Sequence, residues 1–152
     1  MTSITRLNRR RFVQVTGAVA LTTSLAGCGG NDGGAEYLDD EPDYGGWFDD
    51  VDAYEGTVDA TDSDEVAVAV GAGGGLSYDP PAVAISPGTT VVWEWTGDGG
   101  AHDVAAEDGS FTSENVDQEG FTFEHTFDDP GIYEYYCTPH EAVGMKGAIV
   151  VQ

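Results

Sequence analysis

The sequence predicts an all-β fold, an antiparallel β-sandwich over residues 66–152. β-branched and aromatic residues alternate with small or polar residues in several short runs, and glycine or proline separates the runs. The 22 glycines among 152 residues disfavour a helical bundle, and an aromatic content of 11% is too high for a disordered chain. No long segment with helical periodicity follows Val66.

The first three strands are expected within residues 66–95. Valine alternates with alanine over 66–70 before a glycine-rich turn. A second run covers 82–86 and ends at a Pro-Gly pair, which is a turn signal. A third run covers 89–95, and period two places its two tryptophans on one face.

Three further strands are expected at 121–127, 132–137 and 148–151. The phenylalanines of the 121–127 run share one parity, and His125 lies on that parity as a core or rim histidine. A Pro-Gly turn precedes the 132–137 run. Across all the predicted strands, four aromatic residues are expected in the core: Trp93, Trp95, Tyr133 and Tyr135.

The first 27 residues predict an export signal. An arginine run at 9–11 precedes an apolar stretch of about a dozen residues, and Leu25-Ala26-Gly27-Cys28 follows. The arginines resemble a twin-arginine signal, and the small residues before Cys28 resemble a lipobox. We therefore expect residues 1–27 to be a signal peptide and Cys28 to carry a lipid that anchors the exported protein to the outer face of the cell membrane. The alternatives are a short amphipathic helix, or a disulfide between Cys28 and Cys137.

Residues 28–46, which begin with the lipidated cysteine, are rich in glycine and acids and predict a flexible tether. Apolar residues return at Trp47 and Phe48, so residues 47–65 predict an N-terminal extension. It either packs on the domain or continues the tether, and we favour packing.

The charge is strongly negative, with 28 acidic and 5 basic residues and a formal net charge of −23. Four arginines lie in the first eleven residues, and Lys146 is the only other basic residue. This excludes a nucleic-acid binder, because almost nothing can neutralise phosphates. The acids are spread from Asp32 to Glu141, so we favour adaptation to high salt over steering of a basic partner.

Four residues form a candidate metal site. Cys137, His140 and Met145 follow the spacing Cys-x2-His-x4-Met directly after a predicted strand, and His102 lies in a glycine-rich turn. Thiolate and thioether sulfur with two imidazoles suit copper in an electron-transfer site. Alone, each residue would be interpreted as core packing, a buried thiol or a turn histidine. Together, at this spacing, they predict one copper ion.

Residues 66–152 resemble the small blue copper proteins, the plastocyanin-like cupredoxins, and nearly the whole chain is similar to their lipid-anchored archaeal members. The resemblance implies a cupredoxin-type Greek-key β-sandwich with one type-1 copper. It also implies transfer of one electron between membrane-bound respiratory partners, whose identity stays open. By matching positions, the metal ligands are His102, Cys137, His140 and Met145. The ring edge of His140 is then expected at the surface among small apolar residues.

One position departs from the family pattern. The residue after the first histidine is commonly asparagine, and here it is Asp103. A carboxylate accepts hydrogen bonds but does not donate them, so a weaker or rewired tie between the ligand loops is expected. Its negative charge should also favour Cu(II) and lower the reduction potential.

The competing functions fit less well. A multicopper enzyme needs further histidine clusters, and this chain has three histidines. A non-metal binding module leaves the spacing of cysteine, histidine and methionine unexplained. A copper storage or delivery protein is the alternative, although it would show repeated methionine or histidine. We expect a monomeric electron carrier, not an enzyme.

Overall fold

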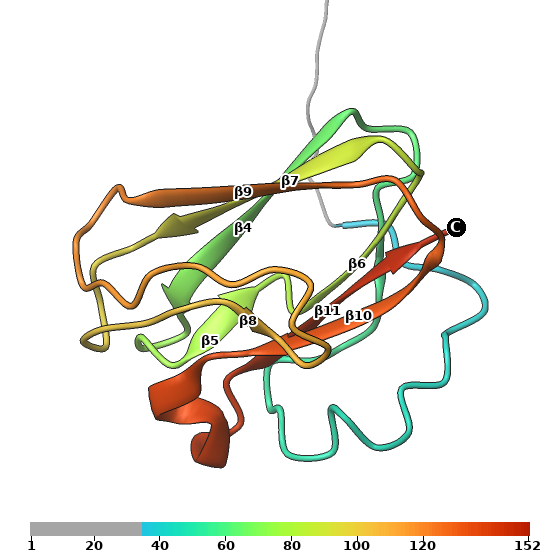
Figure 1. Cartoon of the computed structure of the whole chain (residues 1–152). Helices are drawn as coiled ribbons and strands as arrows, with labels where there is room; N and C mark the ends of the chain where they lie inside the picture. Colours follow the sequence, from blue (N-terminus) through green and yellow to red (C-terminus); the bar gives the residue numbers. More distant parts are fainter. Residues whose placement is uncertain (1–34) are drawn as a thin grey trace, which may run out of the picture. The chain divides into compact units, whose positions relative to one another are not determined.

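The protein is a two-sheet β-sandwich in the computed structural model, which describes residues 35–152 (Figure 1). The expected signal peptide and lipidated Cys28 lie outside the described residues. No helix in residues 35–152 has the length and apolar character needed to cross a bilayer. The elements are β3 (Val58–Asp59), β4 (Glu65–Ala72), β5 (Ser77–Asp79), β6 (Ala82–Ile85), β7 (Thr89–Trp95), β8 (Ala105–Ala106), β9 (Thr122–Phe127), β10 (Gly131–Tyr136), the 3-10 helix η3 (Thr138–Val143) and β11 (Lys146–Val151).

The core lies between the two sheets. One sheet has the strand order β3-β6-β11-β10-β8 and the other β5-β4-β7-β9. Trp93 and Tyr135 are fully buried, one from each sheet, and their rings meet edge to face at 5.5 Å. In β7 every second residue is buried, and in β9 every second residue is half-buried or buried, as the sequence alternation predicts. His125 is half-buried beside the rings of Phe111 and Phe127, which confirms it as a rim residue.

The predicted antiparallel pairing is correct only in part, because the sheets are mixed. β4 runs parallel to β7, and β6 runs parallel to both β11 and β3. The other pairs are antiparallel. Period-two alternation is the same for both pairings, since it reflects only which face of a strand is buried. Sequence alternation therefore identified the strands but not their directions.

Three strands were absent from the sequence prediction: β3, β5 and β8. Each spans only two or three residues. A run this short contains too few side chains to display a period, so pairing with a longer neighbour is what defines it.

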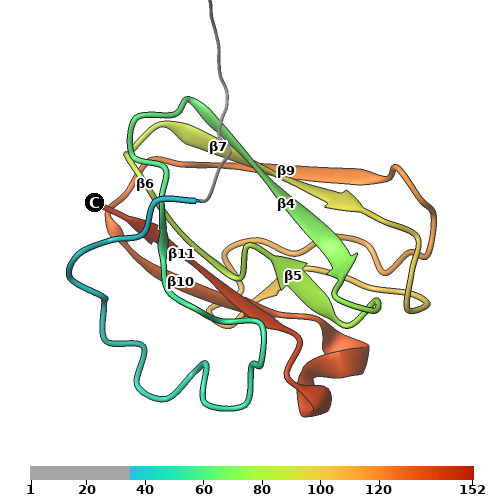
Figure 2. The same ribbon diagram turned by 180° about the vertical axis from the view of Figure 1, so that it is seen from behind.

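The extension (residues 47–65) packs on the outer face of the sheet that contains β6 and β11 (Figure 2). Phe48 and Val51 are buried against Ala82 and Ala148, and the ring of Phe48 stacks on Tyr54 at 4.2 Å. Burial of these side chains stabilises the attachment by a few kcal/mol, at roughly 25 cal/mol per Å² of apolar area.

The packed structure begins before residue 47, because residues of the expected tether contact the extension. Tyr37 forms a bridge with Val58. The carboxylate of Glu41 accepts hydrogen bonds from the Thr57 backbone N–H at 2.8 Å and from the Tyr54 hydroxyl at 2.5 Å. Residues 37–46 are therefore attached to the extension by polar contacts, which their low apolar content did not indicate.

Candidate metal centre

The first segment of the site carries His102, which follows the glycine-rich turn after β7. Its backbone is held by a pair of hydrogen bonds with Val116, at 2.8 Å and 3.0 Å. The indole N–H of Trp95 donates to the carbonyl of His102 at 3.2 Å. A core residue of the sandwich thus holds the backbone of this turn, and His102 is fully buried.

The second segment is the ligand loop (residues 137–145), which leaves β10 at Cys137 and returns to β11. Within it, His140 N–H donates to the Cys137 carbonyl, and Met145 N–H donates to the His140 carbonyl. Cys137 N–H donates in turn to the Met145 carbonyl at 3.0 Å and closes the loop. Pro139 lies in the first turn of η3, and Gly144 ends the helix at φ +90°, a left-handed conformation that favours glycine.

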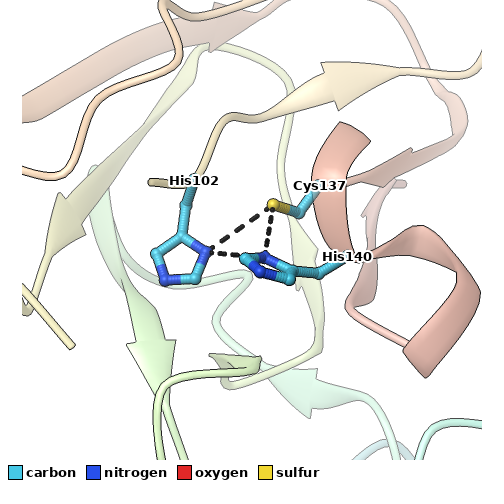
Figure 3. A group of neighbouring side chains, drawn as sticks. All are labelled: His102, Cys137 and His140. Atoms are coloured by element: carbon cyan, nitrogen blue, oxygen red, sulfur yellow. Dashed lines mark hydrogen bonds between the residues drawn. The ribbon is translucent and has the colours of Figure 1, made fainter. Parts of the chain in front are cut away.

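Three donor atoms from these two segments converge on one point (Figure 3). The Cys137 Sγ lies 3.6 Å from His102 Nδ1 and 3.4 Å from His140 Nδ1, and the two Nδ1 atoms are 3.2 Å apart. Cys137 is a free thiol and is buried, while His140 is partly exposed. One sulfur and two imidazole nitrogens facing a common point form a donor set that fits copper.

The far side of the His102 ring fixes its orientation. Its Nε2 lies 2.7 Å from the backbone carbonyl oxygen of Asp98, so this nitrogen carries the proton. The lone pair of Nδ1 is then available toward Cys137. A carbonyl that orients a histidine in this way is typical of metal sites. Gly71 leaves room for the arrangement, because a Cβ there would come within 2.8 Å of the same carbonyl oxygen.

Burial shifts the pKa values of two site residues in the metal-free protein. Desolvation raises the pKa of the Cys137 thiol to about 11. Desolvation, and then the neighbouring His102, lower the pKa of His140. At neutral pH the thiol is therefore protonated and the His140 imidazole is neutral. A metal that binds thiolate must displace one proton, so its affinity should rise with pH.

Asp103 connects the two ligand segments directly. Its Oδ1 accepts a hydrogen bond from the Thr138 backbone N–H at 2.7 Å, and the side chain is buried. A tie between the ligand loops is therefore present with aspartate at this position. The tie needs only an acceptor on residue 103, because the backbone N–H of residue 138 supplies the donor.

The structure brings the donor atoms of three of the four predicted residues together. Met145, the fourth, is fully buried and its backbone is bonded to Cys137 and His140. Sequence reasoning missed the role of the Asp98 carbonyl. No side-chain signal could have found it, since every residue type has a carbonyl.

Comparisons with known proteins found similarity to a family of copper-binding proteins. A family model described as copper binding proteins, plastocyanin/azurin family, matches residues 64–152. Halocyanin from Natronomonas pharaonis is 49% identical over 160 residues, covering 96% of this chain and 98% of the relative. Plastocyanin from Scenedesmus fuscus is 32% identical over 99 residues, covering 58% of this chain and 100% of the relative. The structure of a mutant plastocyanin of fern has a TM-score of 0.51 at 22% identity, covering 57% of this chain and 99% of that one, which shows the fold alone.

Proposed function

Since the chain belongs to the plastocyanin/azurin family of copper-binding proteins, we propose that His102, Cys137, His140 and Met145 hold the copper through which it exchanges electrons with membrane-bound respiratory partners. The chain is a halocyanin-like cupredoxin, a blue copper electron-transfer protein with one copper. The ligand set, the membrane anchor and the partners are the parts that we propose.

The observation that carries the proposal is the convergence of one sulfur and two imidazole nitrogens within 4.8 Å of one another. Two histidines and one cysteine with a weak axial methionine are the ligands of electron-transfer copper sites. Met145 ends the ligand loop, and its backbone N–H donates to the His140 carbonyl. It is the fourth ligand in our proposal. Copper, when bound, supplies the one-electron couple between Cu(I) and Cu(II).

The residues around the site are arranged to change little between the two oxidation states. Backbone hydrogen bonds close the ligand loop, and Asp103 ties it to the segment of His102. The Asp98 carbonyl holds the imidazole of His102 in one orientation. Preorganised ligands keep the reorganisation on electron transfer small, so transfer is fast at a modest driving force.

His140 offers the route for electrons to the surface. It is the only partly exposed member of the donor cluster, and Pro139, Ala142 and Val143 around it are exposed. Val143 is 62% exposed, so an apolar side chain faces solvent next to the site. A small apolar patch suits a brief encounter with a redox partner.

Replacing Ala142 with glutamate should slow electron transfer to partners about tenfold, because an added charge opposes desolvation of the patch. The measurement is stopped-flow reoxidation of the reduced protein by membranes of the native cells. Ala142→Gln, which has the same shape without the charge, is the control. An unchanged rate in the glutamate variant would mean that partners dock elsewhere.

Replacing Asp103 with asparagine should raise the reduction potential, since it removes a negative charge near the copper and keeps an acceptor for Thr138 N–H. Asp103→Ala should cost about 1–3 kcal/mol of stability, because it leaves that N–H unpaired. Redox titration and denaturant unfolding measure the two effects. A potential that is the same in wild type and Asp103→Asn contradicts the electrostatic argument.

Membrane attachment through a lipid on Cys28 is supported by the sequence around that cysteine. Cys28→Ser should move the protein from the membrane fraction to the soluble fraction, because the lipid supplies the apolar area that enters the bilayer. Fractionation of native cells followed by immunoblotting measures this. Equal membrane association of both proteins would exclude a lipid anchor at this position.

A further inference from the structure

The extension contacts the start of β11, directly after the ligand loop, through polar side chains. The indole Nε1–H of Trp47 donates to the carbonyl of Gly147 at 3.0 Å. The Lys146 ammonium lies 4.9 Å from the centroid of the Trp47 ring and 3.1 Å from Asp50 Oδ1. Lys146 is the only basic residue after Arg11, and its side chain is 16% exposed. The single cation of the domain is thus held by the extension, one residue after Met145.

The backbones of the two segments also touch. A Cβ at Gly144 would overlap the carbonyl oxygen of Asp50, so only glycine allows this approach. Gly144 also has φ +90°, which independently favours glycine there. The chain on either side of Met145 is therefore in contact with the extension.

The extension is itself firmly attached at this place. Phe48 and Val51 are buried on Ala82 and Ala148, which lie on neighbouring strands. Trp47 directly precedes Phe48, and Asp50 directly precedes Val51. The two residues that contact residues 144–147 are therefore held in place by their anchored neighbours. Because the Asp50 side chain is 56% exposed, solvent screening leaves the Lys146–Asp50 pair a minor contribution. The Trp47 hydrogen bond and the backbone contact are the larger ones.

We propose that Trp47 and the backbone of Asp50 are positioning elements for Met145. On its loop side, Met145 is held by backbone bonds with Cys137 and His140. On the other side, the extension fixes residues 144, 146 and 147. The distance of an axial methionine tunes the potential of a copper site, so the extension contributes to setting that potential. This inference rests on the proposed function, in which Met145 is the fourth ligand.

The test uses the full-length chain with Trp47→Phe, which removes the N–H donor and keeps an aromatic ring. In metal-free protein, hydrogen exchange of the amides of residues 144–147 should accelerate about fivefold, the effect of losing a bond worth about 1 kcal/mol. In copper-loaded protein, the reduction potential and the intensity ratio of the visible absorption bands should both shift. Asp50→Asn should shift them little, because it keeps the backbone contact and removes only the ion pair. Trp47→Leu, which also removes the N–H donor, is the second variant should Trp47→Phe fold poorly.

Tyr54→Phe is the matched control, because it removes one hydrogen bond of the same extension, that to Glu41, away from residues 144–147. It should leave the potential, the band ratio and the exchange of residues 144–147 unchanged. The proposal is overturned if Trp47→Phe leaves all three unchanged, or if Tyr54→Phe moves them equally. A wild-type chain without a blue band would defeat the proposed function instead, and exchange in the metal-free proteins would then decide whether the extension positions these residues.

Discussion

Replacing Cys137 with serine is expected to abolish the visible absorption of the copper-loaded protein completely. The intense colour of such a site comes from charge transfer between a thiolate and Cu(II), and Cys137 Sγ is the sulfur that lies beside both imidazole nitrogens. A serine hydroxyl is not ionised at neutral pH and is a poor donor for Cu(I). We therefore expect copper affinity to fall by several orders of magnitude as well. Optical titration with Cu(II) measures the loss of colour, and competition with a chromophoric chelator measures the affinity.

His125→Gln is the control for this experiment, because it alters the one histidine that lies outside the donor cluster. His125 is packed beside Phe111 and Phe127 on the rim of the core. The variant should retain the full absorption of the wild type. Retained colour in Cys137→Ser, or lost colour in a folded His125→Gln protein, would mean that the ligand assignment is wrong.

Replacing Trp93 with alanine is expected to destabilise the protein by about 3–5 kcal/mol. Trp93 is fully buried, and its ring contacts the rings of Phe111, Phe123 and Tyr135. Its removal leaves a cavity at the centre of the core that surrounding aromatic rings cannot fill without leaving their own contacts. A loss of this size is a large part of the 5–15 kcal/mol that stabilises a typical domain.

Denaturant unfolding of metal-free protein is the measurement, because bound copper would add its own stabilisation. Leu76→Ala is the control for loss of a large aliphatic side chain, since Leu76 is 41% exposed. It should cost less than about 1 kcal/mol. Equal losses in the two variants would show that Trp93 is not at the centre of the core.

The part of the site that could be predicted from sequence is the group of residues that lie close together in the sequence. Cys137, His140 and Met145 lie within nine residues, so their spacing alone indicates convergence. His102 is distant in sequence and was assigned through its glycine-rich turn and the family resemblance. Strand alternation likewise identified the buried faces of β7 and β9 but not the parallel pairing of β4 with β7.

The remaining features depend on backbone atoms and on contacts between distant segments. The Asp98 carbonyl orients His102 whatever side chain residue 98 carries. The contact of Asp50 with Gly144 joins segments more than ninety residues apart. Neither an aspartate nor a glycine indicates in the sequence that the other lies beside it. Asp103 departs from the family pattern in the sequence, but its partner in the loop tie is a backbone N–H, which no side-chain pattern identifies.

The central claim, one copper held by thiolate and imidazole for electron transfer, is tested most directly by an optical spectrum. The full-length chain is titrated with Cu(II), and its spectrum is recorded before and after ascorbate. We predict an intense blue band that saturates at one equivalent of copper, disappears with ascorbate and returns on reoxidation. A protein that binds copper and stays colourless would contradict the claim.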